Sequence, residues 1–143
     1  MASNAETIDL IGAVSRSIRR HMRGALAPFD IPPALARALR VLDQAREPMR
    51  MSDLADALRI ERRSATDVVE QLVERGFVER RSDPADKRAT VIELTGDGAR
   101  MVTAIAKIRT SVSHKAAAPL EADEVAELHR LLTKLLAADD CER

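Results

Sequence analysis

The chain has 143 residues, which fits one ordinary domain or one small domain with helical extensions. Its 45% apolar content is nearly all aliphatic, with two Phe and no Trp or Tyr, so stacking of bases or flavins on aromatic rings is almost excluded. Lys and Arg total 23, as do Asp and Glu, so the chain lacks the overall basicity that would by itself indicate nucleic-acid binding. Any such site must be local.

The single cysteine, Cys141, excludes an internal disulfide and a cysteine-based zinc cage within one chain, and it fits a reducing cytoplasm. No apolar run approaches the roughly 20 residues that span a bilayer. The N-terminal segment MASNAETIDL lacks the basic region and apolar stretch of a signal peptide. We therefore expect a cytoplasmic protein that makes no use of a membrane.

Two helices are expected at the start of the chain. Apolar residues recur at three- and four-residue steps between residues 6 and 27, which predicts an amphipathic helix ended by Pro28. The apolar stripe consists of Ile8, Ile11, Val14, Ile18, Met22 and Ala25. After the IPP break, residues 33–46 predict a shorter helix with Leu35, Leu39 and Leu42 inward, closed by Pro48.

The first helix also carries a stripe of arginines on its opposite face. This stripe is Arg16, Arg19, Arg20 and Arg23, and the C-terminal part of the chain offers Glu121, Asp123, Glu124 and Glu127 as partners. Ion pairing between the helices or plain solvation is favoured over contact with DNA phosphates, since charge runs on helices usually face water.

The next two helices form a predicted helix-turn-helix. Ser52 is expected to be the N-cap of a helix of about two turns over DLADALR, with Leu54, Ala55 and Leu58 facing a core. A second helix, RRSATDVVEQLVER, places Ala65, Val68, Val69, Leu72 and Val73 on one face. Gly76 stands where the residue after a helix adopts a positive φ.

A hairpin, or wing, follows the second helix. FVERR and ATVIEL favour β-strands, and the polar loop SDPADKR joins them. From Thr95, Val102, Ile105, Ile108 and Val112 mark a long helix; after Pro119, Val125, Leu128, Leu131, Leu132, Leu135 and Leu136 mark a last one. The expected fold is mostly α with a small β part (α+β). A winged helix-turn-helix over residues 31–95 is flanked by helical regions 1–30 and 96–143.

The second helix has one end that DNA could tolerate. A recognition helix presents short polar and basic side chains near its N-terminus, and here Glu70 and Glu74 follow on the later turns, where carboxylates held near phosphates would be repelled. An alternative is that Arg63 and Asp67 form a solvated surface pair worth about 0.3–0.5 kcal/mol. The basic wing tip favours DNA, and Asp86 is expected to hold Arg88 by a charge-assisted hydrogen bond. The candidate DNA-binding residues are Ser52, Arg62, Arg63, Ser64, Thr66, Asp67, Gln71, Lys87 and Arg88.

The run LADALRIERRSATDVVEQLVERGFVERRSDPADKRATVIELTGDG resembles the winged helix-turn-helix of the MarR family of bacterial transcriptional regulators. The D-x-R of Asp86 and Arg88, followed by Leu94, Thr95 and Gly98, carries much of the likeness. The resemblance implies an obligate homodimer joined by its N- and C-terminal helices, a palindromic DNA target, and often a small-molecule signal. It also implies base or phosphate contacts by Arg62, Arg63, Ser64 and Thr66, and a wing contact by Arg88.

Some positions depart from the family pattern. Asp67 stands where a basic or neutral residue is frequent, Glu61 where a small N-cap is usual, and Arg59 where Gly is common, so the bases that would be read are open. Members that sense oxidants use a cysteine near the N-terminus, and this chain has none there.

Independently of the family, the aliphatic faces of residues 8–26 and 125–136 are too apolar to remain in water and are expected to pair across a two-fold axis. Mainly because of the resemblance, a small, mostly apolar organic effector such as a weak acid is expected to lower DNA affinity by binding where the dimer helices meet the winged domain. Arginines such as Arg23 near the junction of the first two helices could meet its carboxylate. The expected pocket residues are Met22, Arg23, Leu26, Phe29, Leu35 and Leu39, for which a plain core role is the alternative.

Other functional classes find little support in the sequence. His21, His114 and His129 lack the spacing of a helical metal site, so neither a metal nor another cofactor is expected. No GxSxG, HExxH or glycine-rich phosphate loop is present, so enzymatic activity is not expected. The competing interpretation is a winged-helix module that binds a protein instead of DNA.

Overall fold

A computed structural model describes residues 1–140 of the chain, so Cys141 lies outside the described residues. The elements follow in the order α1 (Asn4–Leu26), a 3-10 turn η1 (Ala27–Phe29), α2 (Pro33–Ala45), β1 (Met49–Arg50), α3 (Met51–Leu58), α4 (Arg62–Glu74), β2 (Val78–Ser82), β3 (Thr90–Leu94), α5 (Gly96–Ala117) and α6 (Ala122–Asp140). This is the mostly helical winged helix-turn-helix with helical extensions that the sequence predicts.

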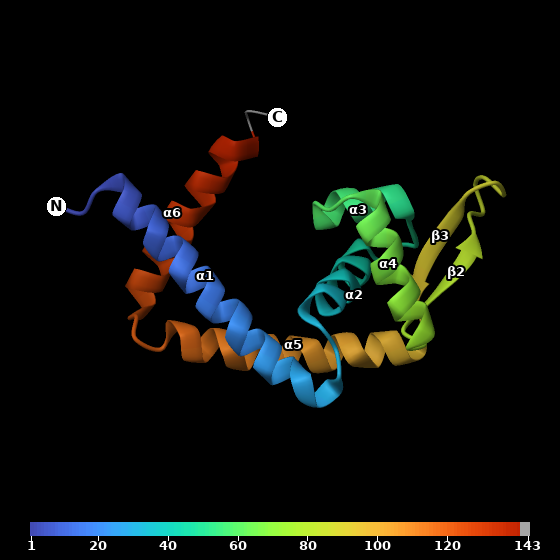
Figure 1. Ribbon diagram of the computed structural model, residues 1–143, viewed down its shortest axis with the longest axis horizontal. Coiled ribbons are helices and arrows are strands. Elements are labelled where there is room, and N and C mark those ends of the chain that lie inside the picture. Colours follow the sequence, from blue (N-terminus) through green and yellow to red (C-terminus); the bar gives the residue numbers. More distant parts are fainter. Residues whose placement is uncertain (141–143) are drawn as a thin grey trace.

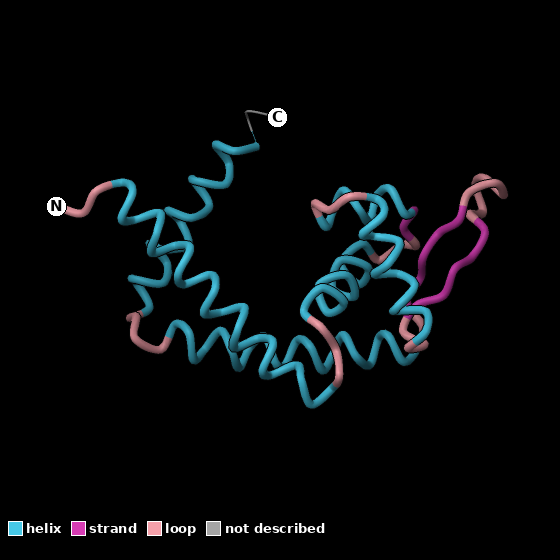
Figure 2. Tube along the Cα trace, viewed as in Figure 1, coloured by secondary structure: helices cyan, strands magenta, loops and turns pink. Residues whose placement is uncertain are grey.

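The long helix α5 connects the two ends of the molecule (Figure 1). Its N-terminal end lies beside the group formed by α2, α3, α4 and the wing, and its other end leads to α6. Helix α1 packs along α5, and α6 turns back beside α1. The tube in Figure 2 shows the loop of the β2–β3 hairpin projecting away from the helices at the far end from α6.

The hydrophobic core lies among α2, α3, α4 and the sheet, and the end of α1 and the middle of α5 close it. Its fully buried large side chains are Leu26, Leu35, Leu39, Leu54, Val69, Leu72, Ile92 and Ile105. Because this core contains Leu26 and Ile105, the flanking helices and the winged region share one packed interior. Close packing of this kind fixes the direction in which α4 and the wing face solvent.

The helix boundaries confirm most of the predicted breaks but not the predicted cap of α3. This helix begins at Met51, with Arg50 as its N-cap and no side-chain capping bond, so Ser52 lies exposed within the first turn and is not the N-cap. At the end of α4, Gly76 has a φ of 75° as predicted. Val73, which was predicted to face the core, is 40% exposed. The residues of α4 that are buried are Ala65, Val69 and Leu72.

The sheet contains a third strand, which was not predicted. Two-residue β1 pairs antiparallel with β3 through Met49 opposite Ile92 and Arg50 opposite Val91. The order of strands is β1-β3-β2, and β2 pairs with β3 from Val78 opposite Leu94 to Ser82 opposite Thr90. The wing is therefore tied to the start of α3, because Arg50 is the last residue of β1 and the N-cap of α3.

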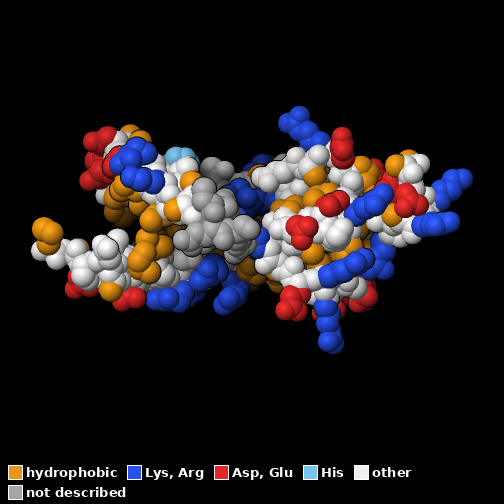
Figure 3. Space-filling model, turned by 90° about the horizontal axis from the view of Figure 1, so that it is seen from above, with side chains coloured by type: hydrophobic (Ala, Val, Ile, Leu, Met, Phe, Trp, Pro, Cys, Tyr) orange, Lys and Arg blue, Asp and Glu red, His pale blue; other side chains and the backbone are white. Residues whose placement is uncertain are grey.

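The terminal helices leave a large aliphatic surface uncovered. Side chains of α1 and α6 such as Leu10, Val14, Leu128 and Leu135 are between 44% and 65% exposed. Hydrophobic side chains gather between these two helices at the left of Figure 3. Of the two alternatives for the α1 arginine stripe, ion pairing with α6 or plain solvation, the described residues show solvation: the four arginines are exposed, and Glu127 pairs with Arg130 of its own helix.

Candidate nucleic-acid interface

The first two turns of α4 present polar side chains to solvent. Arg62, Arg63 and Ser64 are exposed, whereas Ala65, the next residue along the helix, is fully buried. The Thr66 hydroxyl donates to the carbonyl of Arg62 at 3.0 Å and is therefore held against the helix backbone. This face results from the helical period: the apolar positions that α4 buries alternate with the polar positions that it exposes.

The later turns of α4 carry the remaining candidate residues. Asp67 and Gln71 are exposed, and Gln71 Nε2 donates to the carbonyl of Asp67 at 3.4 Å. The polar face thus changes from cationic at the N-terminus to acidic further on, with exposed Glu70 and Glu74. Only the N-terminal half has the charge that a DNA backbone attracts.

The turn between α3 and α4 adopts the backbone expected where glycine is common. Arg59, the C-cap of α3, has φ 54° and ψ 45°, in the left-handed region. The Ile60 amide donates back to the Ala55 carbonyl at 3.1 Å, which closes the helix end. Glu61 is the N-cap of α4 and provides no side-chain capping bond. The departures at Arg59 and Glu61 therefore change the local side chains and keep the geometry of the turn.

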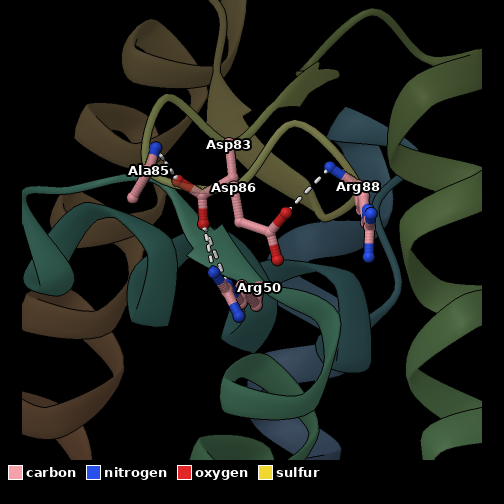
Figure 4. A network of polar contacts seen from close by, with 5 residues as sticks. All are labelled: Arg50, Asp83, Ala85, Asp86 and Arg88. Carbon is pink, nitrogen blue, oxygen red and sulfur yellow. Dashed lines mark hydrogen bonds and ion pairs between the residues drawn. The ribbon is translucent and has the colours of Figure 1, made fainter.

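Two aspartates organise the wing loop, residues 83–89, by accepting backbone hydrogen bonds (Figure 4). Asp83 Oδ1 accepts the Ala85 amide at 2.9 Å, and Asp86 Oδ1 accepts the Arg88 amide at 3.0 Å. Asp86 thus holds Arg88 by a hydrogen bond, as expected, but its partner is the backbone amide of Arg88 and not the guanidinium. Lys87 and Arg88 remain exposed at the tip.

The side-chain ion pair at the wing involves different residues. Arg50 donates to Asp83 Oδ2 from Nε at 2.9 Å and from Nη2 at 2.6 Å (Figure 4). The Ala85 amide, followed by the Arg50 guanidinium, lowers the pKa of the Asp83 carboxyl, and Asp83 in turn raises the pKa of Arg50. The Asp83 side chain is only 13% exposed. Asp83 is therefore an ionised, fully engaged carboxylate at the base of the loop.

A separate cavity of about 400 Å³ lies between α1, α2 and α5. Its lining includes Met22 and Leu26 and the guanidinium-bearing Arg19, Arg37, Arg40 and Arg109. The other predicted pocket residues lie elsewhere: Leu35 and Leu39 are in the core, Phe29 is 45% exposed, and Arg23 is exposed on α1 away from this lining. The proposed location at the α1–α2 junction therefore holds a cavity, but with a different set of arginines.

The electrostatics of the cavity are unbalanced. Burial, then the charges of Arg109 and Arg37, lowers the pKa of Arg40. Arg40 Nε is buried without a hydrogen-bond partner, and among the described residues no carboxylate forms an ion pair with Arg37, Arg40 or Arg109. Arg40 is half-buried and Arg37 and Arg109 are exposed, so three guanidinium groups border the cavity without a carboxylate partner in the described part of the chain, while water still reaches them.

Sequence reasoning did not single out Arg50, Arg40 or Arg109. One signal could have pointed to the cavity. Arg37 and Arg40 stand three residues apart on α2, and the only carboxylate on that helix within reach of Arg40 is Asp43, which is exposed. No comparable signal exists for Arg50, because its partner Asp83 is 33 residues away.

Comparison with known proteins decides the family. The sequence model of the MarR family matches residues 31–90. The multiple antibiotic resistance protein MarR of Escherichia coli K12 is 31% identical over 128 residues, which are 89% of this chain and 88% of MarR. The chain belongs to the MarR family. The winged helix-turn-helix and the exposed polar start of α4 are thus those of a MarR-family transcriptional regulator.

Other relatives agree with this assignment. The HTH-type transcriptional repressor NicR of Pseudomonas putida is 28% identical over 93 residues, and the match spans 65% of this chain but only 59% of NicR. The crystal structure of apo wild-type E. coli MarR aligns with a TM-score of 0.80 at 28% identity, covering 95% of this chain and 98% of MarR. A mutant MarR bound to operator DNA aligns with a TM-score of 0.82, covering 94% and 99%.

The helices described between residues 1 and 140 include none with the length and hydrophobicity that a membrane crossing requires.

Proposed function

We propose that this MarR-family chain is a homodimeric repressor that binds a palindromic DNA site through α4 and the wing. The observation that carries the proposal is the exposed basic and hydroxyl-bearing start of α4, on a fold whose counterpart in E. coli MarR has been crystallised with operator DNA. In this proposal, residues 31–95 form the DNA-binding domain and residues 1–30 and 96–143 the dimerisation region.

The DNA contacts divide between the major groove and the backbone. Arg62, Arg63, Ser64 and Thr66 are at the end of α4 that enters the groove, where arginine can donate two hydrogen bonds to guanine and hydroxyls can meet bases or phosphates. Asp67 and Gln71 follow one turn later, and Ser52 in the first turn of α3 is a candidate phosphate contact. Asp67 would repel phosphate, so its part in the proposal is to accept from a cytosine amino group.

The wing provides the second contact. Lys87 and Arg88 are exposed at the tip of the hairpin, and Asp86 keeps the backbone of Arg88 in a fixed turn. A cation held at the end of a hairpin can reach a neighbouring phosphate or a narrow minor groove without losing much conformational freedom. The wing therefore adds affinity, and α4 adds most of the base selection.

Dimerisation covers the aliphatic surface of α1 and α6. A groove of about 470 Å³ between these helices is lined by Leu10, Ile11, Val14, Ile18, Leu128 and Leu132. Helix α6 makes few contacts with the rest of the described chain, and an isolated helix of its length is only marginally stable in water. A second copy of the same two helices is an occupant of matching chemistry, and a two-fold axis then makes the surface self-complementary.

The effector in this proposal is a small organic acid that occupies the cavity between α1, α2 and α5. Its carboxylate pairs with the guanidinium groups of Arg37, Arg40 and Arg109, and its apolar body contacts Met22 and Leu26. A tenfold loss of DNA affinity requires the effector to bind the non-binding dimer more tightly by about 1.4 kcal/mol. Anisotropy of a labelled operator duplex, titrated with phenolic and aliphatic acids, measures this coupling.

Selection of duplexes from a randomised library tests the central proposal. We expect enrichment of an inverted repeat with half-site centres about 34–36 Å apart, one turn of DNA. A selected site without a dyad would contradict the dimeric arrangement. Failure to enrich any duplex at low salt would contradict DNA binding and favour a protein-binding role for the winged helix.

Substitution at the wing tip then tests the contact set. Arg88→Ala is expected to weaken binding to the selected site by about 1–3 kcal/mol and to lower the salt slope by about 1 if the partner is a phosphate. Lys107→Ala, which removes a cation from the exposed side of α5, is the control for net charge. Equal behaviour of the two variants would show that the wing does not touch DNA.

A further inference from the structure

The ion pair between Arg50 and Asp83 joins two parts of the winged region that are far apart in sequence. Arg50 lies at the last position of β1 and is the N-cap of α3, and Asp83 is the first residue of the wing loop. β1 and β2 flank β3 on opposite sides, so the Arg50 side chain reaches past β3 to contact the loop that follows β2. Figure 4 shows the two side chains facing each other beneath the loop.

Arg50 stands at a position where a capping side chain would normally serve the helix. N-cap residues usually accept a hydrogen bond from the first turn, which arginine cannot do because its guanidinium only donates. No side-chain cap is present at this helix. The side chain is instead directed to Asp83, with two donor nitrogens on one carboxylate oxygen at 2.9 and 2.6 Å. This arrangement gives up capping of α3 and gains a link to the wing.

Both carboxylate oxygens of Asp83 accept hydrogen bonds. Its Oδ2 accepts from Arg50, its Oδ1 accepts from the Ala85 amide, and its backbone amide donates to the Ala89 carbonyl at 2.9 Å. The Asp83 carbonyl accepts the Asp86 amide at 3.2 Å, and Asp86 in turn fixes the Arg88 amide. A continuous set of hydrogen bonds therefore connects Arg50 to the backbone of Arg88.

We propose that Arg50 is a positioning residue, whose ion pair with Asp83 sets the direction in which the wing tip presents Lys87 and Arg88 relative to α4. This inference rests on the proposed DNA binding by α4 and the wing. In this proposal α4 and the wing contact DNA at the same time. A wing that points in the wrong direction therefore loses its contact even when every contacting side chain is present. The pair is also partly exposed, so its contribution to global stability is small and its effect falls on the loop.

The sign of the Asp83→Asn effect distinguishes positioning from simple electrostatics. Asparagine keeps an oxygen for the Ala85 amide but loses the charge that Arg50 binds. Removal of a negative charge near DNA would by itself tighten binding. If the pair positions the wing, Asp83→Asn instead weakens binding by about threefold or more and lowers the salt slope by about 1, although no cation has been removed.

Glu79→Gln is the matched control. Arg81 donates to Glu79 Oε1 from Nε at 2.9 Å and from Nη2 at 2.6 Å, so the pair has the same geometry as Arg50 with Asp83. It lies within the wing, but it joins residues two apart on one strand. Its loss changes net charge by the same amount without releasing the loop, so we expect unchanged or slightly tighter DNA binding.

A double-mutant cycle with Arg50→Gln excludes a direct phosphate contact by Arg50. We expect Arg50→Gln and the double variant Arg50→Gln/Asp83→Asn to bind DNA about as weakly as Asp83→Asn, because the two residues act as one unit. Tighter binding by Asp83→Asn, with a loss in Arg50→Gln that persists in both backgrounds, would overturn positioning and make Arg50 a phosphate ligand.

Hydrogen exchange of the DNA-free protein separates failure of this inference from failure of the proposed function. In Arg50→Gln, the amides of Ala85, Arg88 and Ala89 are expected to exchange faster, with protection of α2 and α4 unchanged. Unchanged hydrogen exchange in the loop overturns the positioning role, whatever the DNA affinity of the variants. Faster exchange in a protein that selects no duplex would leave Arg50 as a support of the wing and overturn its role in DNA binding together with the proposed function.

Discussion

Replacing Gly98 by alanine is expected to destabilise the protein by about 3 kcal/mol, because the first turn of α5 leaves no room for a side chain. A Cβ at this position would lie 2.0 Å from the Phe77 carbonyl oxygen, 3.0 Å from its carbon and 3.2 Å from Leu94 Cδ2. Ordinary contact begins near 3.4 Å, so the backbone of α5 must move by more than 1 Å relative to the start of β2.

The movement also strains the hydrogen bonds that join these segments. The Thr95 amide donates to the Phe77 carbonyl at 3.0 Å, and the Thr95 hydroxyl donates to the Gly76 carbonyl at 2.6 Å. Loss of one such bond costs about 1 kcal/mol, and overpacking adds about 1–3 kcal/mol. At about 2–4 °C per kcal/mol for a chain of this size, the midpoint of thermal unfolding should fall by about 6–12 °C.

Thermal unfolding followed by circular dichroism, at one fixed protein concentration, measures the change. Gly96→Ala is the control, since the nearest atom to its Cβ is the flexible Arg100 Nη1 at 3.6 Å. That variant should be as stable as the parent or slightly more so, because alanine has the higher helix propensity. A Gly98→Ala protein that melts within about 2 °C of the parent would refute the steric argument.

Three further outcomes are expected. Leu128→Glu, which places a charge in the α1–α6 groove, should convert a dimer to a monomer in sedimentation at micromolar concentration, and a persistent dimer would locate the interface elsewhere. Arg40→Met should raise the thermal midpoint of the ligand-free protein slightly, because it removes a half-buried guanidinium whose Nε has no hydrogen-bond partner; an unchanged or lower midpoint would contradict that reasoning. Because the folded pKa of Asp83 lies below its unfolded value, its contribution is present near neutrality and is lost as the pH falls below about 4. Asp83→Asn should therefore lose slightly less stability than the parent as the pH falls below about 4, and a larger loss in the variant would contradict this linkage.

The sequence was sufficient for the parts of the fold that depend on regular periodicity. The spacing of Leu54, Ala55 and Leu58, and of Ala65, Val69 and Leu72, fixes which faces of α3 and α4 are buried. Glycine at position 76 after the last turn of α4 indicates its end, because a positive φ is favourable there. Local rules such as these need no knowledge of distant partners.

The predictions from sequence are wrong where a contact between residues far apart in the chain determines the local structure. Ser52 is a good capping residue, but pairing of β1 with β3 places the extended residue at Arg50, so the helix begins before Ser52. A two-residue strand is too short to produce an alternating pattern. Likewise, Asp86 is close enough in sequence to suggest a pair with Arg88, whereas Arg50 approaches Asp83 only after the sheet has formed.

The expected effector pocket remains a prediction, and the structure changes which residues border it. Leu35 and Leu39 lie in the core and Met22 lines the cavity, yet all three are apolar residues of helices. The sequence therefore does not distinguish a residue that lines a cavity from one that is packed in the core. The arginines are more informative than the leucines. Arg40 is half-buried without a carboxylate partner among the described residues, and its Nε is buried without a hydrogen bond, which carries a desolvation cost that an anion in the cavity would offset.

Helix α5 connects every part of the proposed mechanism. Its first turn is fixed against Phe77 through Gly98, its middle enters the core at Ile105, and one turn later Arg109 lines the cavity. The same helix then leads to α6 and the proposed dimer contact. Since packed interiors transmit displacement with little loss, an anion that draws Arg40 and Arg109 together would change the angle between α5 and α2. In the proposed dimer, a change of that angle would alter the distance between the two copies of α4, which has to match one turn of DNA for both to enter the major groove.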